Sequence, residues 1–221
     1  MQKILIVGGG IGGLTAAIAL QRQGIETEVF EAASELEPVG KGIWMPPNAM
    51  QVFERLGIDD AVAERGLMLR GVEVRDRKQG TLQVLDLEQA KEKYGFTITS
   101  IHRARLQQTL AEHVQSGALH LGTRCTGFAE RRDGRIVVQF EDGSEEVGDV
   151  LIGADGIHST IRQQLFPDVT LRYAGQTCYR GIAELTLKAR SALICQEVWG
   201  GEVRFGSSAI RTGEVYWFPP M

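Results

Sequence analysis

The amino-acid sequence predicts an α/β fold, in which a β-α-β nucleotide-binding unit precedes a sheet of antiparallel strands. A short apolar strand at 4–7 runs into a glycine-rich turn and a helix, the pattern of such a unit. After Pro167, several strand-like segments follow one another instead. The composition is that of an ordinary globular protein, because 43% of the 221 residues are apolar and 24% are charged.

Composition also excludes several function classes. The formal net charge of −4 argues against a nucleic-acid-binding protein, which would carry a basic surplus. No apolar run approaches the ~20 residues of a membrane span. Three widely separated cysteines, Cys125, Cys178 and Cys195, predict separate buried thiols in a reducing cytoplasm. The four histidines show no metal-ligand spacing, so no metal site is expected.

The first 31 residues predict the β-α-β unit. Residues 4–7 form a buried strand, 12–23 a helix that ends at Gly24, and 25–30 a second strand that ends at Glu31. Such a unit requires parallel strands and a right-handed crossover.

The rest of the chain predicts shorter elements. Residues 32–47 are rich in proline and glycine and predict a long loop, after which Asn48 caps a short helix to Leu56. We expect a hairpin at 70–87, helices at 103–115 and 157–166, and a buried parallel strand at 150–153. The remaining expected strands are 118–121, 125–131, 135–140, 177–187, 192–199, 203–206 and 213–218. A boundary near residue 170 separates the two predicted domains, 1–170 (with the hairpin inserted) and 171–221.

The turn after the first strand matches the dinucleotide fingerprint GxGxxG. It reads Gly8-Gly9-Gly10-Ile11-Gly12-Gly13. The first glycine allows the tight turn, the second lets a pyrophosphate approach the backbone, and the third lets the helix pack on the strand. The helix N-terminus, with Ile11 and Gly12 in its first turn, offers free N–H groups and a positive dipole end to phosphates.

Glu31 supplies the acidic partner of this fingerprint, at the end of the second strand. A carboxylate there accepts hydrogen bonds from ribose hydroxyls and repels a 2′-phosphate, which favours FAD or NAD over NADP as the bound nucleotide. The alternative is a glycine-rich turn that binds no ligand, with Glu31 a solvated strand end.

Three further segments resemble the FAD-dependent aromatic hydroxylases of the para-hydroxybenzoate hydroxylase type, the class A flavoprotein monooxygenases. Residues 149–162 resemble that family's second fingerprint through Asp155, Gly156, Ser159 and Arg162. Residues 42–50 resemble the loop that approaches the flavin ring, and 101–106 resemble the segment whose arginine, here Arg103, meets the FAD phosphates and ribose. The similarity is greatest to the branch of salicylate and urate hydroxylases and zeaxanthin epoxidase.

The resemblance implies a Rossmann-like FAD-binding domain of the glutathione reductase type with an antiparallel β-sheet substrate domain. The family's third fingerprint, a Gly-Asp pair followed by Ala-Ala-His, has no counterpart in residues 157–221, so we expect a fragment of a longer enzyme. The cofactor-binding residues then expected are Gly8, Gly10, Ile11, Gly12, Gly13, Glu31, Gly42, Arg103, Asp155, Gly156 and Arg162.

The implied reaction is hydroxylation of an aromatic or similar small organic substrate. In this family NADH or NADPH, bound transiently, reduces FAD, and the reduced flavin forms a hydroperoxide with dioxygen that transfers one oxygen atom. Arg204 or Arg180 would hold an anionic substrate, and Tyr216 would orient or deprotonate a ring substituent. Two alternatives stay open: an FAD-dependent reductase or oxidase of the same fold, and a non-catalytic nucleotide-binding remnant.

Overall fold

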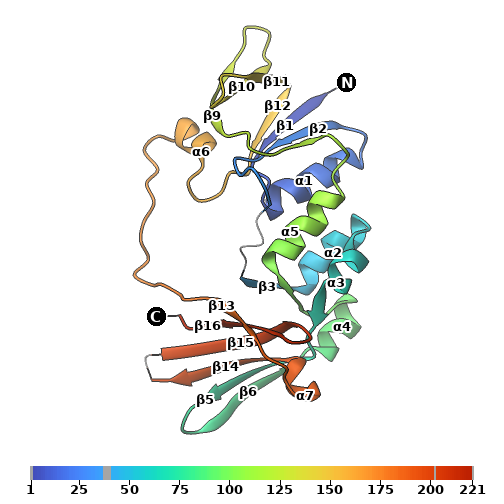
Figure 1. Ribbon diagram of the computed structural model, residues 1–221, viewed down its shortest axis with the longest axis vertical. Coiled ribbons are helices and arrows are strands. Elements are labelled where there is room, and N and C mark those ends of the chain that lie inside the picture. The colour runs from blue at the N-terminus through green and yellow to red at the C-terminus, as the bar shows by residue number, and fades with distance from the viewer. Residues whose placement is uncertain (1, 37–40, 202, 221) are drawn as a thin grey trace. The chain divides into compact units, whose positions relative to one another are not determined.

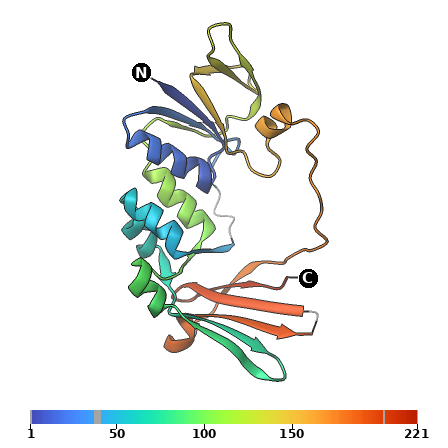
Figure 2. The ribbon, with the colours of Figure 1, turned by 180° about the vertical axis from the view of Figure 1, so that it is seen from behind.

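The computed structural model describes residues 2–36, 41–201 and 203–220, which form two compact units (Figures 1 and 2). The first unit holds residues 2–36 and 107–172, and the second holds 41–106 and 173–220. The division falls within helix α5 (Arg103–Glu112). The predicted assignment of FAD binding to 1–170 and of substrate binding to 171–221 stays a prediction, while the compact units group 41–106 with 173–220.

The first unit is built on a parallel sheet with the strand order β12-β1-β2-β8. Its other elements are one long helix, a three-stranded antiparallel sheet of order β11-β10-β9, and a short helix. The bounds are β1 (Lys3–Val7), α1 (Ile11–Gln21), β2 (Glu26–Phe30), β8 (Leu119–His120), β9 (Cys125–Glu130), β10 (Ile136–Phe140), β11 (Glu145–Gly148), β12 (Val150–Gly153) and α6 (Thr160–Leu165).

The alternation of side chains along β1 explains how the first unit is layered. Leu5 and Val7 point to one face of the sheet, where they join a buried cluster with Val138 and Phe140 of the antiparallel sheet. Ile4 and Ile6, equally buried, point to the opposite face, and α1 contacts β1 and β2. The predicted β-α-β unit is therefore confirmed, with β1 parallel to both β2 and β12.

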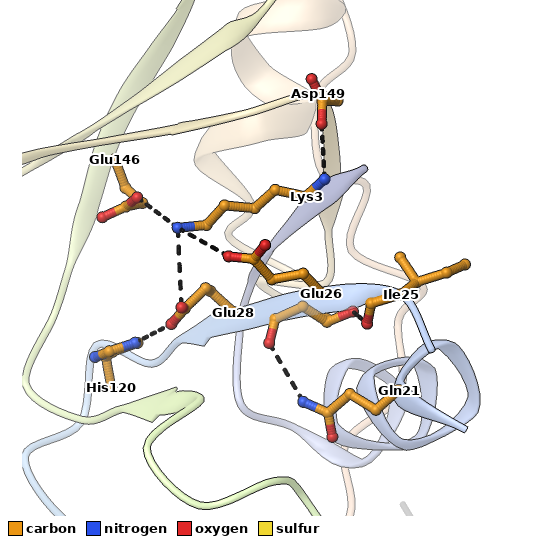
Figure 3. Close-up of polar contacts among 9 residues, drawn as sticks. Lys3, Gln21, Ile25, Glu26, Glu28, His120, Glu146 and Asp149 are labelled. Carbon is orange, nitrogen blue, oxygen red and sulfur yellow. Dashed lines mark hydrogen bonds and ion pairs between the residues drawn. The ribbon is translucent and has the colours of Figure 1, made fainter. Parts of the chain in front are cut away.

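Lys3 ties three strands of the first unit together by charge (Figure 3). Its ammonium lies 2.7 Å from a carboxylate oxygen of Glu146, 3.8 Å from Glu28 and 3.9 Å from Glu26. Burial alone would lower the pKa of Lys3, but the Glu146 hydrogen bond and the three negative charges raise it overall. The His120 ring extends this network through its contact with Glu28.

The second unit contains two sheets. Six strands form a mixed sheet of order β13-β16-β15-β14-β5-β6, and three form an antiparallel sheet of order β3-β7-β4. The bounds are β3 (Gly42–Met45), α2 (Pro47–Arg55), α3 (Asp59–Glu64), β4 (Gly66–Met68), β5 (Gly71–Asp76), β6 (Gly80–Asp86), α4 (Glu88–Tyr94), β7 (Thr99–His102), β13 (Gly181–Glu184), α7 (Ala189–Ala192), β14 (Ile194–Gly200), β15 (Val203–Arg211) and β16 (Glu214–Phe218).

Buried hydroxyl groups join the two sheets of the second unit. The Oγ of Ser208 on β15 lies 3.0 Å from the Oγ of Ser100 on β7 and accepts a 2.9 Å hydrogen bond from the indole Nε1 of Trp44 on β3. Both serines are almost fully buried. The small sheet therefore packs on β15 with its polar groups paired, as buried polar groups require.

Several expectations from the sequence are corrected by the structure. The predicted loop 32–47 contains strand β3, because Gly42–Met45 find a partner in β7; residues 37–40 of that loop lie outside the described residues. Helix α2 is capped by Pro46 rather than by Asn48, with Pro47 in the first helical position. Helices α5 and α6 are shorter than predicted.

Strand β12 is a parallel strand as expected, paired with β1, but it is not buried. It is the edge of its sheet, and Val150 is 36% exposed. The strands expected after residue 170 form, although β14 pairs in parallel with β5 instead of lying in a purely antiparallel sheet.

The three cysteines are free, and Cys125 and Cys195 are buried as predicted, whereas Cys178 is half-exposed. Burial raises the pKa of the Cys195 thiol to about 12. Among the helices described, none has both the length and the apolar composition needed to cross a membrane.

Candidate functional site

The glycine loop follows β1 and is packed too closely for side chains at two of its positions. Gly8 has a φ of +110°, and a Cβ there would lie 2.3 Å from the carbonyl oxygen of Ala154. A Cβ on Gly13 would lie 1.9 Å from the carbonyl oxygen of Gly8. The first and third glycines of the fingerprint therefore allow the turn and the close packing of helix on strand that the sequence predicted.

The second glycine faces open space. Gly10 caps α1 in an extended conformation, and a Cβ on Gly10 or on Gly12 would meet no atom within 4 Å. No side chain caps this helix, and no acidic residue lies in its first turn. An uncapped helix N-terminus whose glycines leave room for close approach fits a pyrophosphate, the central group of FAD.

Glu31 is held against this loop by two backbone groups. Its Oε2 accepts a 2.6 Å hydrogen bond from the N–H of Gly9, and its Oε1 accepts a 2.9 Å bond from the N–H of Ala33. An ionised carboxylate has about four acceptor positions, so each oxygen retains capacity for a ribose hydroxyl. The carboxylate is thus fixed at the end of β2, next to the phosphate loop.

The Asp155–Gly156 turn lies beside the glycine loop, because β12 and β1 are neighbours and end at the same edge of the sheet. The N–H of Ala154 donates a 2.7 Å hydrogen bond to the carbonyl of Val7. The Asp155 carboxylate accepts hydrogen bonds from the Ser159 hydroxyl (2.5 Å) and the Ile161 N–H (3.2 Å). Asp155 therefore stabilises the start of α6.

Arg162 also stabilises this turn through hydrogen bonds to its backbone. Its guanidinium donates hydrogen bonds to the carbonyls of Gly156 (3.3 Å) and Ile157 (2.5 Å). In this arrangement the arginine holds the turn that carries Asp155, and direct contact between Arg162 and the cofactor stays a prediction.

In the second unit, Gly42 and Tyr216 are brought together. A Cβ on Gly42 would lie 2.2 Å from Cγ of the Tyr216 ring, so this ring packs directly on the backbone of β3. Tyr216 is 6% exposed and stacks on Phe218 with 5.3 Å between ring centroids. Burial raises the pKa of the Tyr216 phenol, against the opposing positive charge of Arg180. Tyr216 is therefore suited to donate or accept a hydrogen bond as a neutral phenol, and poorly suited to be a base.

Arg204 lies on the same face of the sheet as Tyr216 but not in contact with it. Tyr216 is paired with Ser208, four residues further along β15 than Arg204, which corresponds to about 13 Å along a strand. The Arg204 side chain is half-exposed and stacks over the Trp199 ring at 5.6 Å, with Glu197 at 3.8 Å. Arg180 is exposed. Substrate roles for Arg204 and Tyr216 stay predictions.

Arg103 begins α5 as predicted, with its side chain exposed and its N–H bonded to the carbonyl of Lys41. The preceding residue, His102, has a function that the sequence did not reveal. Its Nδ1 accepts a 3.1 Å hydrogen bond from the N–H of Ala104, which satisfies a free donor at the helix start.

Protonation of His102 would turn this acceptor into a donor, so we expect the stability of the protein to depend on pH. Burial first, and the charge of Arg105 second, lower the pKa of His102. The unfolded chain then binds more protons, and the free energy of unfolding should fall as the pH drops below about 6.5 towards that lowered value. Urea unfolding between pH 8 and pH 5.5 measures this.

A variant with asparagine at this position provides the control for the pH experiment. Asn is a good helix cap but does not titrate, so the difference in stability between wild type and His102→Asn should change with pH only in that window. A constant difference over the whole range would contradict the assignment.

One contact at the glycine loop had no signal in the sequence. The side-chain amide of Gln107 donates a 2.7 Å hydrogen bond to the carbonyl of Gly9, and both residues belong to the first unit. A single glutamine on a helix carries no motif, so only the structure identifies it. In the described parts of the chain, no cluster of three or more His, Cys, Asp or Glu side chains is placed to hold a metal.

Comparison with known proteins agrees with this geometry. Residues 1–201 match the model of the FAD binding domain family. The chain is 40% identical over 215 residues to the aurachin C monooxygenase/isomerase of Stigmatella aurantiaca, which covers 97% of this chain and 56% of that protein. It is 33% identical over 223 residues to an FAD-dependent urate hydroxylase of Klebsiella pneumoniae, covering 98% of this chain and 57% of the relative.

Solved structures give the same result. Klebsiella pneumoniae HpxO, in complex with FAD and uric acid, superimposes with a TM-score of 0.90 and 30% sequence identity over 100% of this chain and 56% of HpxO. The chain thus spans about half the length of the curated relatives that it matches. On the strength of the family match and the glycine loop, the chain belongs to the FAD binding domain family, within the class A flavoprotein monooxygenases.

Proposed function

We propose that this chain is the FAD-binding part of a monooxygenase that inserts one atom of dioxygen into an aromatic or similarly electron-rich small molecule. NADH or NADPH would serve as the transient reductant. The observation that carries the proposal is the uncapped N-terminus of α1, where a Cβ on Gly10 would meet no atom within 4 Å and the preceding residue, Gly9, is bonded to the carboxylate of Glu31. The names of the relatives support the reaction class.

Each set of residues has a distinct task in this proposal. The loop from Gly8 to Gly13 would bind the pyrophosphate, and Glu31 the adenosine ribose. The Asp155–Gly156 turn, held by Arg162, would position the remaining part of the dinucleotide. In the second unit, Gly42 and Arg103 are proposed for the flavin and its phosphates, and Arg204 and Tyr216 for the substrate.

The bound flavin would supply the redox chemistry, so that NAD(P)H, a proton, dioxygen and the substrate yield NAD(P)⁺, water and the hydroxylated product. The side chains of this chain would bind the flavin and the substrate and orient them relative to each other. The phenol of Tyr216, neutral because burial raises its pKa, would orient a polar group of the substrate by a hydrogen bond. The half-exposed guanidinium of Arg204 would attract an anionic substrate.

Flavin binding and the fate of dioxygen test this proposal in sequence. Titration of the purified chain with FAD should quench flavin fluorescence with a defined Kd, whereas absence of binding would overturn the proposal. For a chain that retains FAD, NADH and NADPH are then compared as reductants under ¹⁸O₂. The substrates supplied are those named for the relatives: urate, 3-hydroxybenzoate, 3-amino-4-hydroxybenzoate and aurachin C.

One ¹⁸O atom in the product and one in water would support a monooxygenase. If FAD is reduced and dioxygen is converted to hydrogen peroxide, the protein is an oxidase of the same fold. If FAD is reduced and no dioxygen is consumed, it is a reductase. The cytoplasmic location predicted from the sequence is kept as part of the proposal, because all three thiols are free.

A further inference from the structure

The Gly9 residue of the phosphate loop is held by side chains at both of its backbone polar groups. Its N–H donates to Oε2 of Glu31 at 2.6 Å, and its carbonyl accepts from Nε2 of Gln107 at 2.7 Å. Gly9 is buried, and Glu31 and Gln107 reach it from different elements, β2's end and α5. Glu31 belongs to the predicted fingerprint, whereas Gln107 has no assigned task.

The bond from Gln107 fixes more than the carbonyl that it contacts. The carbonyl of Gly9 and the N–H of Gly10 belong to one peptide group, and no cis peptide bond occurs in the described chain. In a planar trans peptide these two groups point in opposite directions. A side chain that holds the Gly9 carbonyl therefore also sets the direction of the Gly10 N–H, which points away from Gln107.

The Gly10 N–H stands at the start of α1, where a Cβ on Gly10 would meet no atom within 4 Å. We infer that Gln107 is a positioning residue for the cofactor: it orients the Gly9–Gly10 peptide so that the Gly10 N–H is presented to the pyrophosphate before FAD binds. This inference rests on the FAD binding proposed above.

An uncharged amide suits this position. It donates one N–H to the carbonyl and adds no charge that would pair with a phosphate in place of the backbone. Loss of the donor would leave a buried carbonyl without a partner and let the peptide rotate, so the loop would need to be ordered again on binding.

The test compares two neighbouring glutamines on α5. Gln107→Leu removes the donor at nearly constant volume, and Gln108→Leu makes the same change at an exposed position one residue further on. We expect the Kd of Gln107→Leu for FAD, and for ADP as a probe of the pyrophosphate site, to rise about tenfold. Gln108→Leu should bind both like wild type and unfold in the same urea range. Gln107→Leu should stay folded without denaturant but unfold at a lower urea concentration, because it leaves the buried Gly9 carbonyl without a partner.

A second readout separates this inference from the proposed function. In the ligand-free protein, the ¹³C resonance of the Gly9 carbonyl and the ¹⁵N resonance of Gly10 should shift in Gln107→Leu and stay unchanged in Gln108→Leu. A wild type that binds neither FAD nor ADP would refute the proposed function. The two resonances would still test whether Gln107 orients the Gly9–Gly10 peptide. Unchanged resonances, or a Kd within twofold of wild type, would overturn the role of Gln107. Should Gln107→Leu fail to fold, Gln107→Asn, which keeps the amide but shortens its reach, takes its place.

Discussion

Replacement of Gly13 by alanine is expected to destabilise the first unit by about 3 kcal/mol and to abolish FAD binding. The added Cβ would lie 1.9 Å from the carbonyl oxygen of Gly8, and 3.3 Å from Cβ of Ala154. Because the nearest obstacle is backbone, no side-chain rotation relieves the overlap, and α1 must move away from β1. Urea unfolding and flavin fluorescence titration measure the two effects.

The neighbouring residue provides the control for this experiment. Gly12 lies in the same turn of α1, but its added Cβ meets nothing within 4 Å. Gly12→Ala should therefore leave the fold intact and stabilise it by up to about 1 kcal/mol, since alanine is the better helix former. Equal destabilisation by both substitutions would contradict the close packing of helix on strand.

A third variant in this loop separates stability from binding. Gly10 has a φ of −73° and a ψ of 178°, a conformation that valine adopts readily, and its Cβ position is open. Gly10→Val should lower the free energy of unfolding by at most about 1 kcal/mol. The same substitution should abolish flavin retention, because the side chain would occupy the space that a pyrophosphate needs. Retention of FAD by this variant would refute the assignment of the loop.

Replacement of Gly42 by alanine is the second change with a large expected effect. The new Cβ would lie 2.2 Å from Cγ and 2.5 Å from Cβ of Tyr216. Either β3 moves away from β16, which carries Tyr216, or the buried tyrosine leaves its stacked position on Phe218. We expect a loss of about 3 kcal/mol in the free energy of unfolding, measured with urea.

A double-mutant cycle identifies Tyr216 as the cause. Tyr216→Ala alone removes a buried aromatic ring, which costs about 3–5 kcal/mol. In the double variant the alanine at position 42 has room, so the two losses should not add, and the coupling free energy should reach about 1–3 kcal/mol. If the two losses in unfolding free energy are additive, the destabilisation by Gly42→Ala does not come from contact with the Tyr216 ring.

Residues close together in the chain allowed the geometry of the glycine loop to be predicted. Gly8, Gly13 and Glu31 belong to one β-α-β unit, whose geometry follows from local pattern and handedness. The sequence predicted a parallel strand at 150–153 before Asp155, but the pairing of this strand, β12, with β1 is known only from the structure.

The remaining features depend on partners distant in sequence. Gly42–Met45 reads as a loop because prolines and glycines surround it, and it becomes a strand only because β7 pairs with it. Strand β12 has the apolar sequence of a buried strand, yet nothing local shows that it forms the edge of its sheet. Gln107 and His102 act through single hydrogen bonds to backbone, for which sequence patterns carry no sign.

The pairing of strands also bears on the order in which the chain folds during synthesis. One side of β1 is completed by β12, with Ile4 opposite Val150, and one side of β5 is completed by β14, with Gly71 opposite Ile194. Such non-local parallel pairings form slowly, because the chain loses the entropy of closing a long loop before the strand contacts contribute any stabilisation. While the ribosome makes the intervening residues, the edge of β1 that later pairs with β12 leaves its backbone N–H and C=O groups without strand partners. The nascent protein is therefore open to wrong strand pairing with other chains until residue 153 has emerged.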